Sequence, residues 1–271
     1  MATLAIRPGR VAFTSLVVAI FAFLLLPLVV IIWASFFADK ILTFPPSAYT
    51  VAYYARAWRL PDFASGFVVS LELGVVATIG SLAVGIPASY AIERFRFPGR
   101  ETIRQFLLSP MYVPAIVAGA AMYIYFVQVE ILTHFQLAAT FTGLAIAHTI
   151  GAIPWTLRLV CASLQASNAS SEEAARSLGA NPLETFFLVT LPIIRPGIIA
   201  AAMFSFIASF SDLEKSLFLV GPGKTTLQIA IVNYLEWNLD STIAAVATVQ
   251  IVIIAIALLV SDRYVKLGKA F

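Results

Sequence analysis

Charged side chains are scarce in this sequence. Aspartate, glutamate, lysine and arginine make up 11% of its residues, whereas soluble globular domains carry about 25%. Hydrophobic residues make up 61%, and the mean hydropathy is +0.94. A soluble domain with this composition would have too little polar surface to face water. The scarcity of charge therefore excludes a soluble protein and predicts an integral membrane protein.

Cysteine and histidine are also rare. Cys161 is the single cysteine, which excludes an intrachain disulfide. The two histidines, His134 and His148, do not have the spacing of metal ligands, so neither a metal nor a cofactor is predicted. His148 falls inside an apolar run, and two interpretations stay open for it. It is either hydrogen-bonded to a neighbouring helix as a neutral imidazole, or it is a ligand-binding group.

Long apolar stretches are abundant. A bilayer core about 30 Å thick is crossed by about 20 helical residues. Six segments are long and apolar enough, which predicts an all-α fold with six transmembrane helices: 11–34, 67–91, 106–127, 137–157, 193–213 and 241–261. The fifth is the weakest, because Arg195, Pro196 and Asp212 stand at its ends. The first is predicted to be a retained span, because its apolar run is longer than a signal peptide's and no small-x-small cleavage site follows.

Lysine and arginine are distributed unevenly between the connecting segments. If the N-terminus is cytoplasmic, the inner segments hold twelve of the seventeen basic residues: Arg7, Arg10, Arg94, Arg96, Arg100, Arg104, Arg158, Arg176, Arg195, Arg263, Lys266 and Lys269. The outer segments hold Lys40, Arg56, Arg59, Lys215 and Lys224. Cytoplasmic loops are enriched in lysine and arginine, so both termini are predicted to be cytoplasmic. The pI near 9.1 then reflects topology, and no nucleic-acid partner is predicted.

A polar stretch, SSEEAARSLGANPLETFFLVTLP at residues 170–192, separates the fourth and fifth spans. Ser170 and Glu173 have the spacing of a capping box, which predicts that a helix starts there. This helix is predicted to run through Leu178, with Ala174, Ala175 and Leu178 on one face, and to end at Gly179 in a left-handed turn.

A second short helix is predicted after this turn. Asn181 is a suitable N-cap, Pro182 a suitable first helical residue, and Glu184 stands at the third position. Pro192 is predicted to close the unit. Helices of eight or nine residues do not persist alone in water, so the pair requires a partner.

The spacing within this stretch resembles a known motif. Glu173-Ala174-Ala175 is followed after three residues by Gly179, then after nine by Val189, and then after one by Leu191-Pro192. This resembles the EAA loop, EAA-x3-G-x9-I-x-LP, of permease subunits in binding-protein-dependent ABC importers. Valine in place of isoleucine is the one departure among seven defined positions. The alternative is an amphipathic linker, which explains the capping residues but not the full spacing.

The resemblance implies a fold and a set of partners. It implies the type I (MetI-like) permease fold, as a single transmembrane domain over 1–271 in a bacterial inner membrane. Within it, 1–66 form the first span and an outer segment, 67–262 form the core spans, and 165–192 form the cytoplasmic loop. The implied partners are a dimer of cytoplasmic ATPase subunits, a second homologous permease, an extracytoplasmic solute-binding protein and the lipid bilayer.

The resemblance also assigns roles to residues of the loop. The expected ATPase-coupling residues are Glu173, Ala174, Ala175, Gly179, Leu191 and Pro192. Two rival classes are a secondary transporter, for which neither inverted repeats nor ion-coordinating groups are detected, and a non-transporting membrane scaffold.

No catalytic site is predicted. The segment GPGKTT at residues 221–226 is similar to the end of a Walker A loop, but that motif requires glycine where Phe218 stands. The segment is predicted to be a turn before a short outer helix or re-entrant segment. By the resemblance, ATP hydrolysis belongs to the partner ATPase, and this chain is not an enzyme.

Acidic residues in or near the spans are candidates for a solute path, since such charges tend to line one. They are Glu72 in the second span and Asp212 and Glu214 at the outer end of the fifth. The stretch SFSDLEKSLFLVGPG resembles spermidine and putrescine permeases, which implies a polyamine or similar cationic solute. Aminoethylphosphonate, ferric iron and thiamine are the alternatives. Pairing with Lys215 would weaken the inference from charge, and the carboxylates alternatively face headgroups, the binding protein or a neighbouring helix.

The small residues of the fifth span recur at helical spacing. Gly197, Ala201, Ser205 and Ala208 lie three or four residues apart, which places them on one side of a helix. Asp212 continues this row, so it is predicted to point toward the protein interior.

Overall fold

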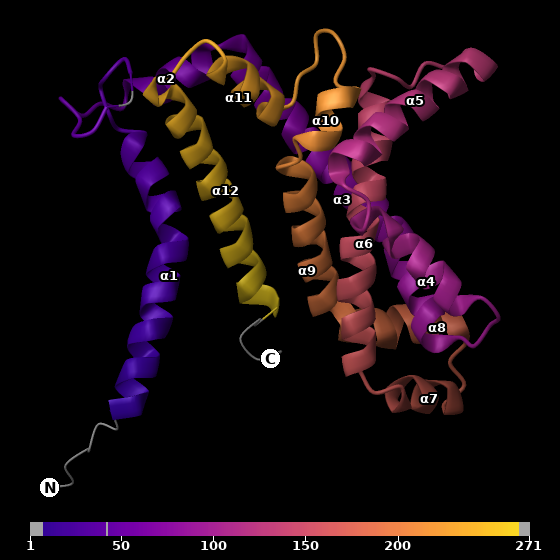
Figure 1. Ribbon diagram of the computed structural model, residues 1–271. Helices are drawn as coiled ribbons and strands as arrows, with labels where there is room; N and C mark the ends of the chain where they lie inside the picture. Colours follow the sequence, from indigo (N-terminus) through magenta and orange to yellow (C-terminus); the bar gives the residue numbers. More distant parts are fainter. Residues whose placement is uncertain (1–7, 42, 266–271) are drawn as a thin grey trace, which may run out of the picture. The chain divides into compact units, whose positions relative to one another are not determined.

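The computed structural model describes residues 8–41 and 43–265, and these are helical with short connections (Figure 1). The basic residues Arg7, Lys266 and Lys269, used above for orientation, lie outside this range. The elements are α1 (Pro8–Ala34), α2 (Ala52–Arg59), α3 (Pro61–Arg94), α4 (Arg100–Leu108), η1 (Ser109–Met111), α5 (Ala115–Thr133), α6 (Phe141–Ala166), α7 (Ser170–Ser177), α8 (Pro182–Thr185), η2 (Phe186–Thr190), α9 (Leu191–Phe210), α10 (Glu214–Leu219), α11 (Leu227–Leu235) and α12 (Ser241–Val265).

Six helical segments are long and apolar enough to cross a membrane, which confirms the predicted number. Within the described residues they are Phe13–Ala34, Pro61–Arg94, Ala115–Thr133, Phe141–Ala166, Pro182–Phe210 and Ser241–Arg263. The first, second, fourth and sixth predicted spans agree with these helices. The first predicted span begins two residues early and the fourth begins four residues early. The third and fifth required correction.

The third span begins at Ala115 rather than at residue 106. The chain before it forms α4 and the single 3₁₀ turn η1, and Pro114 directly precedes the span. Proline fixes its own φ and disfavours the α region for the residue before it. The two prolines Pro110 and Pro114 therefore interrupt the apolar run, and the span continues to Thr133, where His134 turns into the left-handed region.

The fifth span corrects the prediction for Pro192. Helical structure runs without a break from Pro182 to Phe210, so Pro192 does not close the polar unit. The segment just before it, η2, is π-helical, and Leu191 N donates to Phe186 O five residues back. Proline removes one helical donor and clashes with the carbonyl four residues earlier. The wider π turn gives that carbonyl room, so the helix continues through the proline.

The described chain divides into two compact units. One contains Pro61–Asn233 and the described residues from Ile254 onward, and its core is the packing of α3, α6 and α9, which run side by side (Figure 1). Small residues allow this close approach: a Cβ at Gly80 would lie 2.8 Å from Thr149 Cγ2. Thr156 Oγ1 of α6 lies 3.1 Å from both Ser81 Oγ of α3 and Ser205 Oγ of α9. Small residues and interhelical hydroxyl bonds are the usual means of joining helices in a bilayer.

The row of small residues on α9 faces this core. Ala201 and Ser205 are fully buried, and a Cβ at Gly197 would overlap the Ser163 side chain. Asp212, which follows the end of α9, is also buried. The predicted interior direction of this row is confirmed.

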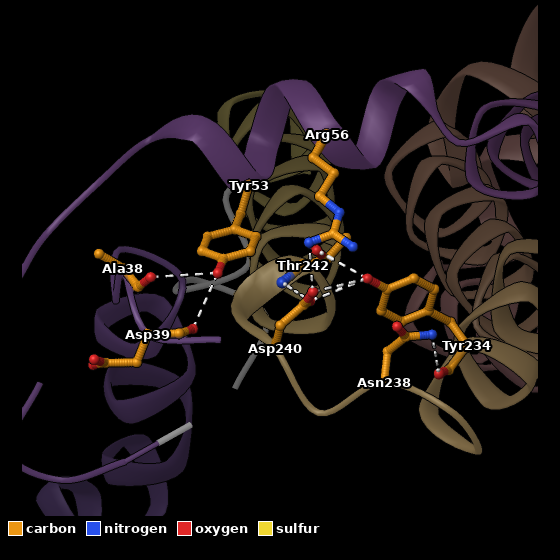
Figure 2. Close-up of polar contacts among 8 residues, drawn as sticks. All are labelled: Ala38, Asp39, Tyr53, Arg56, Tyr234, Asn238, Asp240 and Thr242. Atoms are coloured by element: carbon orange, nitrogen blue, oxygen red, sulfur yellow. Dashed lines mark hydrogen bonds and ion pairs between the residues drawn. The ribbon is translucent and has the colours of Figure 1, made fainter. Parts of the chain in front are cut away.

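The other unit contains the described residues up to Leu60 together with Tyr234–Ile253. Figure 2 shows its central contacts, which converge on the buried carboxylate of Asp240. This carboxylate accepts from Thr242 N at 2.9 Å, from Tyr234 Oη at 3.0 Å and from Arg56 Nη1 at 2.8 Å. It thereby caps the first turn of α12 and joins that turn to α2 and α11. Tyr53 of α2 donates to Asp39 O at 3.0 Å, which fixes the loop after α1.

Candidate functional site

The loop between α6 and α9 begins with the short helix α7. Its N-cap is Ala169 rather than Ser170, and no side chain caps it. The predicted Ser170–Glu173 capping box is therefore wrong. Asn168 Oδ1 instead accepts from Ser170 N at 3.1 Å, so an asparagine turn starts the helix one residue earlier. Ser170 is already helical, and its hydroxyl no longer has the geometry of a cap.

The end of α7 follows the prediction. Gly179 has φ +96°, its N–H donates to Arg176 O at 3.0 Å, and Ala180 N donates to Ala175 O at 3.1 Å. This pair of bonds is a Schellman motif, which requires a left-handed residue at the glycine position. A Cβ on Gly179 would meet no atom within 4 Å. The glycine is therefore required by its backbone angle and not by crowding.

The second helix start is confirmed in detail. Asn181 Oδ1 accepts from Glu184 N at 2.9 Å, and Glu184 Oε2 accepts from Asn181 N at 2.8 Å. These reciprocal bonds form a capping box with Pro182 at the first helical position. The helix that follows is not a short separate one, because α8 continues through η2 into α9. Leu191 and Pro192, the last two residues of the motif, lie in this continuous helix.

The helix α7 has one face turned toward the spans and one left free. Glu172 is buried, whereas Glu173, Ala174 and Leu178 are exposed, and Leu178 is 90% exposed. Leu183, after the turn, is 70% exposed. An apolar patch beside a carboxylate on a loop between two spans is typical of a docking surface.

The buried face of α7 contains a contact that the sequence analysis missed. Arg94 Nε, at the end of α3, donates to Glu172 Oε1 at 2.9 Å. The same guanidinium donates through Nη2 to Ser167 Oγ at 2.8 Å and to Leu164 O at 3.1 Å. Arg94 and Glu172 are 78 residues apart, and no spacing in the sequence indicates their pairing. The one available signal was that both were expected on the same side of the membrane.

A second feature is a cavity of about 390 Å³ beside α6, α9 and α10. Its lining includes Asp212, Glu214 and Lys215 together with His148 and Trp155. Glu72, the third predicted path residue, is not among the lining residues, and its side chain is exposed on α3. The structure therefore brings two of the three predicted acidic residues together.

The charges of this cavity largely balance. Asp212 Oδ2 accepts from Lys215 Nζ in a buried ion pair, and Asp212 Oδ1 accepts from Lys215 N at 3.0 Å at the start of α10. Glycine makes room for this arrangement: a Cβ at Gly119 would lie 3.0 Å from Lys215 Cα, and one at Gly151 would lie 3.1 Å from Lys215 Cε. Glu214 is exposed, so it adds a negative charge beside a neutralised pair.

His148 is bonded on both sides, as one of its two interpretations required. Its Nδ1 lies 2.8 Å from Ser209 Oγ and its Nε2 lies 3.2 Å from Ser216 Oγ. Ser216 donates its own hydroxyl proton to Asp212 O at 3.0 Å, so it accepts from Nε2–H, and Ser209 donates to Nδ1. A neutral imidazole satisfies both bonds. In the described part of the chain no three histidine, cysteine or acidic side chains gather as metal ligands.

The segment after α10 is a turn, as predicted. Gly221 and Lys224 form an isolated bridge, with Gly223 at φ +76°. The helix α11 follows directly, and Leu227 N donates to Ser70 Oγ of α3 at 2.9 Å. The turn is therefore held against α3 and has none of the strand-to-helix geometry of a phosphate-binding loop.

Comparison with known proteins identifies the family. A family model described as a binding-protein-dependent transport system inner membrane component matches residues 81–267. The chain belongs to this family. It is an ABC importer permease of the bacterial inner membrane, with the all-α fold that its six spans predicted and the MetI-like architecture that the resemblance implied.

Individual members of this permease family are similar over most of the chain. The putrescine transport system permease protein PotI of Escherichia coli K12 is 28% identical over 229 residues, which are 84% of this chain and 81% of PotI. The sulfate transport system permease protein CysT of Salmonella typhimurium is 30% identical over 177 residues, or 62% of this chain and 64% of CysT. A crystal structure of a bacterial ABC transporter that imports alginate has a chain with TM-score 0.72 and 19% identity, over 97% of this chain and 99% of that one.

Proposed function

We propose that this permease is driven by a cytoplasmic ATPase that docks on the loop 170–192. The observation that carries the proposal is the free face of α7, where Glu173, Ala174 and Leu178 are exposed while Glu172 is buried against the spans. Gly179 gives this face a defined end. Docking of the ATPase on this exposed patch of Glu173, Ala174 and Leu178 covers the free side of α7, a helix of eight residues that is too short to persist alone.

The complete importer then contains four kinds of component. A dimer of ATPase subunits supplies hydrolysis, because the segment 221–226 lacks the first glycine of a Walker A loop. A second, homologous permease shares the translocation path, and an extracytoplasmic binding protein delivers the solute. Alternating access of the two permeases, set by the ATPase dimer, moves the solute inward. Glu72, exposed on α3, is assigned to a surface shared with the second permease.

Both chain termini are proposed to be cytoplasmic, together with the loops that contain Arg94 and Arg176. A reporter enzyme that works only in the cytoplasm is expected to be active when it is fused after Gln105 or at the C-terminus. At Gly223, in the exposed turn before α11, a reporter enzyme that works only outside the cytoplasm is expected to be active. A cytoplasmic Gly223 reporter would mean that the fifth helical span does not cross, and the loop 170–192 would then have no defined side.

The proposed solute is a polyamine such as putrescine or spermidine. The cavity of about 390 Å³ holds a small linear amine, and Glu214 leaves it with a net negative charge beside the Asp212–Lys215 pair. Carboxylates attract amines, and an ammonium group paired with a carboxylate is the less costly arrangement near a membrane. The relative PotI has putrescine in its name.

A second candidate is a solute with both an amine and an anionic group, such as aminoethylphosphonate. Lys215 is the observation that favours it, because its ammonium lies in the same cavity. The name of the relative CysT contains sulfate, and an anion of this kind would also be attracted by the Lys215 ammonium. Ferric iron and thiamine stay as further alternatives with no residue of the cavity that favours them.

The solute is tested on the binding protein that accompanies the permease. Titration calorimetry with putrescine, spermidine, aminoethylphosphonate, sulfate, ferric iron and thiamine is expected to give saturable binding of a polyamine and none of sulfate. Binding of an anion without an amine would exclude the polyamine. Uptake of the bound solute by vesicles is expected to require internal ATP, whereas uptake driven by an ion gradient without ATP would indicate a secondary transporter.

A further inference from the structure

The contact between Arg94 and Glu172 joins three elements that meet on one side of the membrane. Arg94 is the last residue of α3, Leu164 and Ser167 end α6, and Glu172 lies in the first turn of α7. The Arg94 side chain is 13% exposed and that of Glu172 is 7% exposed. An ion pair this buried is sensitive to loss of either partner, because the remaining charge is then left without compensation.

Two kinds of contact connect α7 to the spans. Its backbone packs against α8 and η2, which form the start of the fifth helical span. Of the ion pairs within residues 8–41 and 43–265, the one between Arg94 and Glu172 is the one that links α7 to a transmembrane helix. The planar guanidinium binds three acceptors in fixed directions. A displacement of α7 therefore pulls on α3 and on the end of α6 together.

The two helices reached by this contact are those that shape the cavity and the core. α6 contributes His148, Gly151 and Trp155 to the cavity lining, and α3 packs along α6 and α9. We propose that Arg94 and Glu172 form a strut through which movement of α7 is transmitted to α3 and α6. They are positioning residues for transport: neither is among the residues that line the cavity, and neither belongs to the exposed docking patch. The inference rests on the proposed function, since it requires that the ATPase binds α7.

The strut is tested by the amount of solute imported per ATP hydrolysed, measured on the complete importer in proteoliposomes. Arg94→Gln is expected to lower this ratio by about tenfold, within the usual range of coupling between sites. The ATPase subunit should still copurify in the parental amount, because Glu173, Ala174 and Leu178 stay exposed. Arg94→Lys keeps the charge but not the three-way fork, so it is expected to fall between the parent and Arg94→Gln.

Two further variants separate the strut from a general effect of charge. Glu172→Gln keeps an accepting oxygen and loses the charge, so its ratio is expected to fall as well, and less than that of Arg94→Gln. Arg96→Gln removes an arginine that is exposed in the same connecting segment and is expected to keep the parental ratio. A fall in Arg96→Gln equal to that in Arg94→Gln would overturn the inference, because net charge alone would then explain it.

The remaining outcomes are also decisive. If Arg94→Gln imports as much solute per ATP hydrolysed as the parent, the strut is overturned. It is also overturned if Arg94→Gln loses ATPase copurification while the remaining complexes keep the parental amount of solute per ATP, because the role of Arg94 is then purely structural. Leu178→Ser reports on the docking patch itself. If Leu178→Ser leaves copurification and uptake unchanged, the proposed docking function fails. If Leu178→Ser loses both while Arg94→Gln imports normally per ATP, the strut alone fails.

Discussion

Gly179→Val is expected to reduce solute uptake to near background while the permease still inserts and accumulates in the membrane. Gly179 has φ +96°, where a β-branched residue is strained by roughly 1–2 kcal/mol. Relief of that strain requires the Schellman bonds from Gly179 N and Ala180 N to break, which changes the direction of the chain between α7 and α8. The docking patch is then split, and both uptake and the ATP hydrolysis stimulated by transport are expected to fall.

The chain provides a matched control for this substitution. Gly99 has φ +81°, and, as at Gly179, a Cβ added to it would meet no atom within 4 Å. It directly precedes α4 and lies outside the loop 170–192. Gly99→Val therefore introduces the same kind of backbone strain without touching the docking patch, and it is expected to keep most of the uptake. Normal uptake by Gly179→Val, or equal loss in both variants, would remove the coupling assignment.

The parts of this fold that the sequence predicted well depend on residues close together in the chain. The six spans follow from uncharged length, because a bilayer rejects charge over about 20 consecutive helical residues. The turn at Gly179 and the capping box of Asn181 and Glu184 each involve residues within five positions of one another. Their chemistry is local, and it is the same in the folded protein.

The errors arose where two local signals competed. Ser170 and Asn168 both offer an oxygen to the start of α7, and the asparagine, which comes first, accepts from Ser170 N. A proline at position 192 is expected to end a helix, but the wider π turn at η2 leaves room for its ring, so the helix continues. Such a turn has no sequence signature that distinguishes it from a helix end. The prolines before Ala115 were outweighed by the apolar residues around them, and the third span was placed too early.

The sequence was sufficient to predict that Asp212 points toward the protein interior, but not which residues it and its neighbours contact there. Helical spacing from Gly197 to Asp212 was sufficient to place Asp212 toward the interior, and the buried carboxylate confirms it. His148 is hydrogen-bonded to Ser209 and Ser216, which lie 61 and 68 residues further along the sequence. They depend on how α6 packs against α9 and α10, as does the pair of Arg94 and Glu172. Contacts of this kind require the tertiary structure.

Asp212→Asn is expected to raise the concentration of a cationic solute needed for half-maximal uptake by about tenfold to a hundredfold. Asparagine Oδ1 still accepts from Lys215 N at the start of α10, so the backbone of the cavity is kept. The lost charge leaves the Lys215 ammonium uncompensated beside the solute. Two like charges about 5 Å apart at an effective dielectric constant of about 20 repel by a few kcal/mol, and water in the cavity reduces this.

Companion variants determine whether charge is the cause. Asp212→Glu keeps the carboxylate and is expected to retain part of the uptake. The double variant Asp212→Asn with Lys215→Gln restores a neutral pair and is expected to recover more uptake than Asp212→Asn alone. Asp39→Asn removes a half-buried carboxylate in the other compact unit and serves as the control with unchanged uptake. If Asp212→Asn transports a confirmed cationic solute as the parent does, Asp212 does not face the solute.

For an anionic solute the same variant is expected to lower the half-maximal concentration, because the freed Lys215 then attracts the solute. The direction of the change therefore also separates the two candidate solute classes.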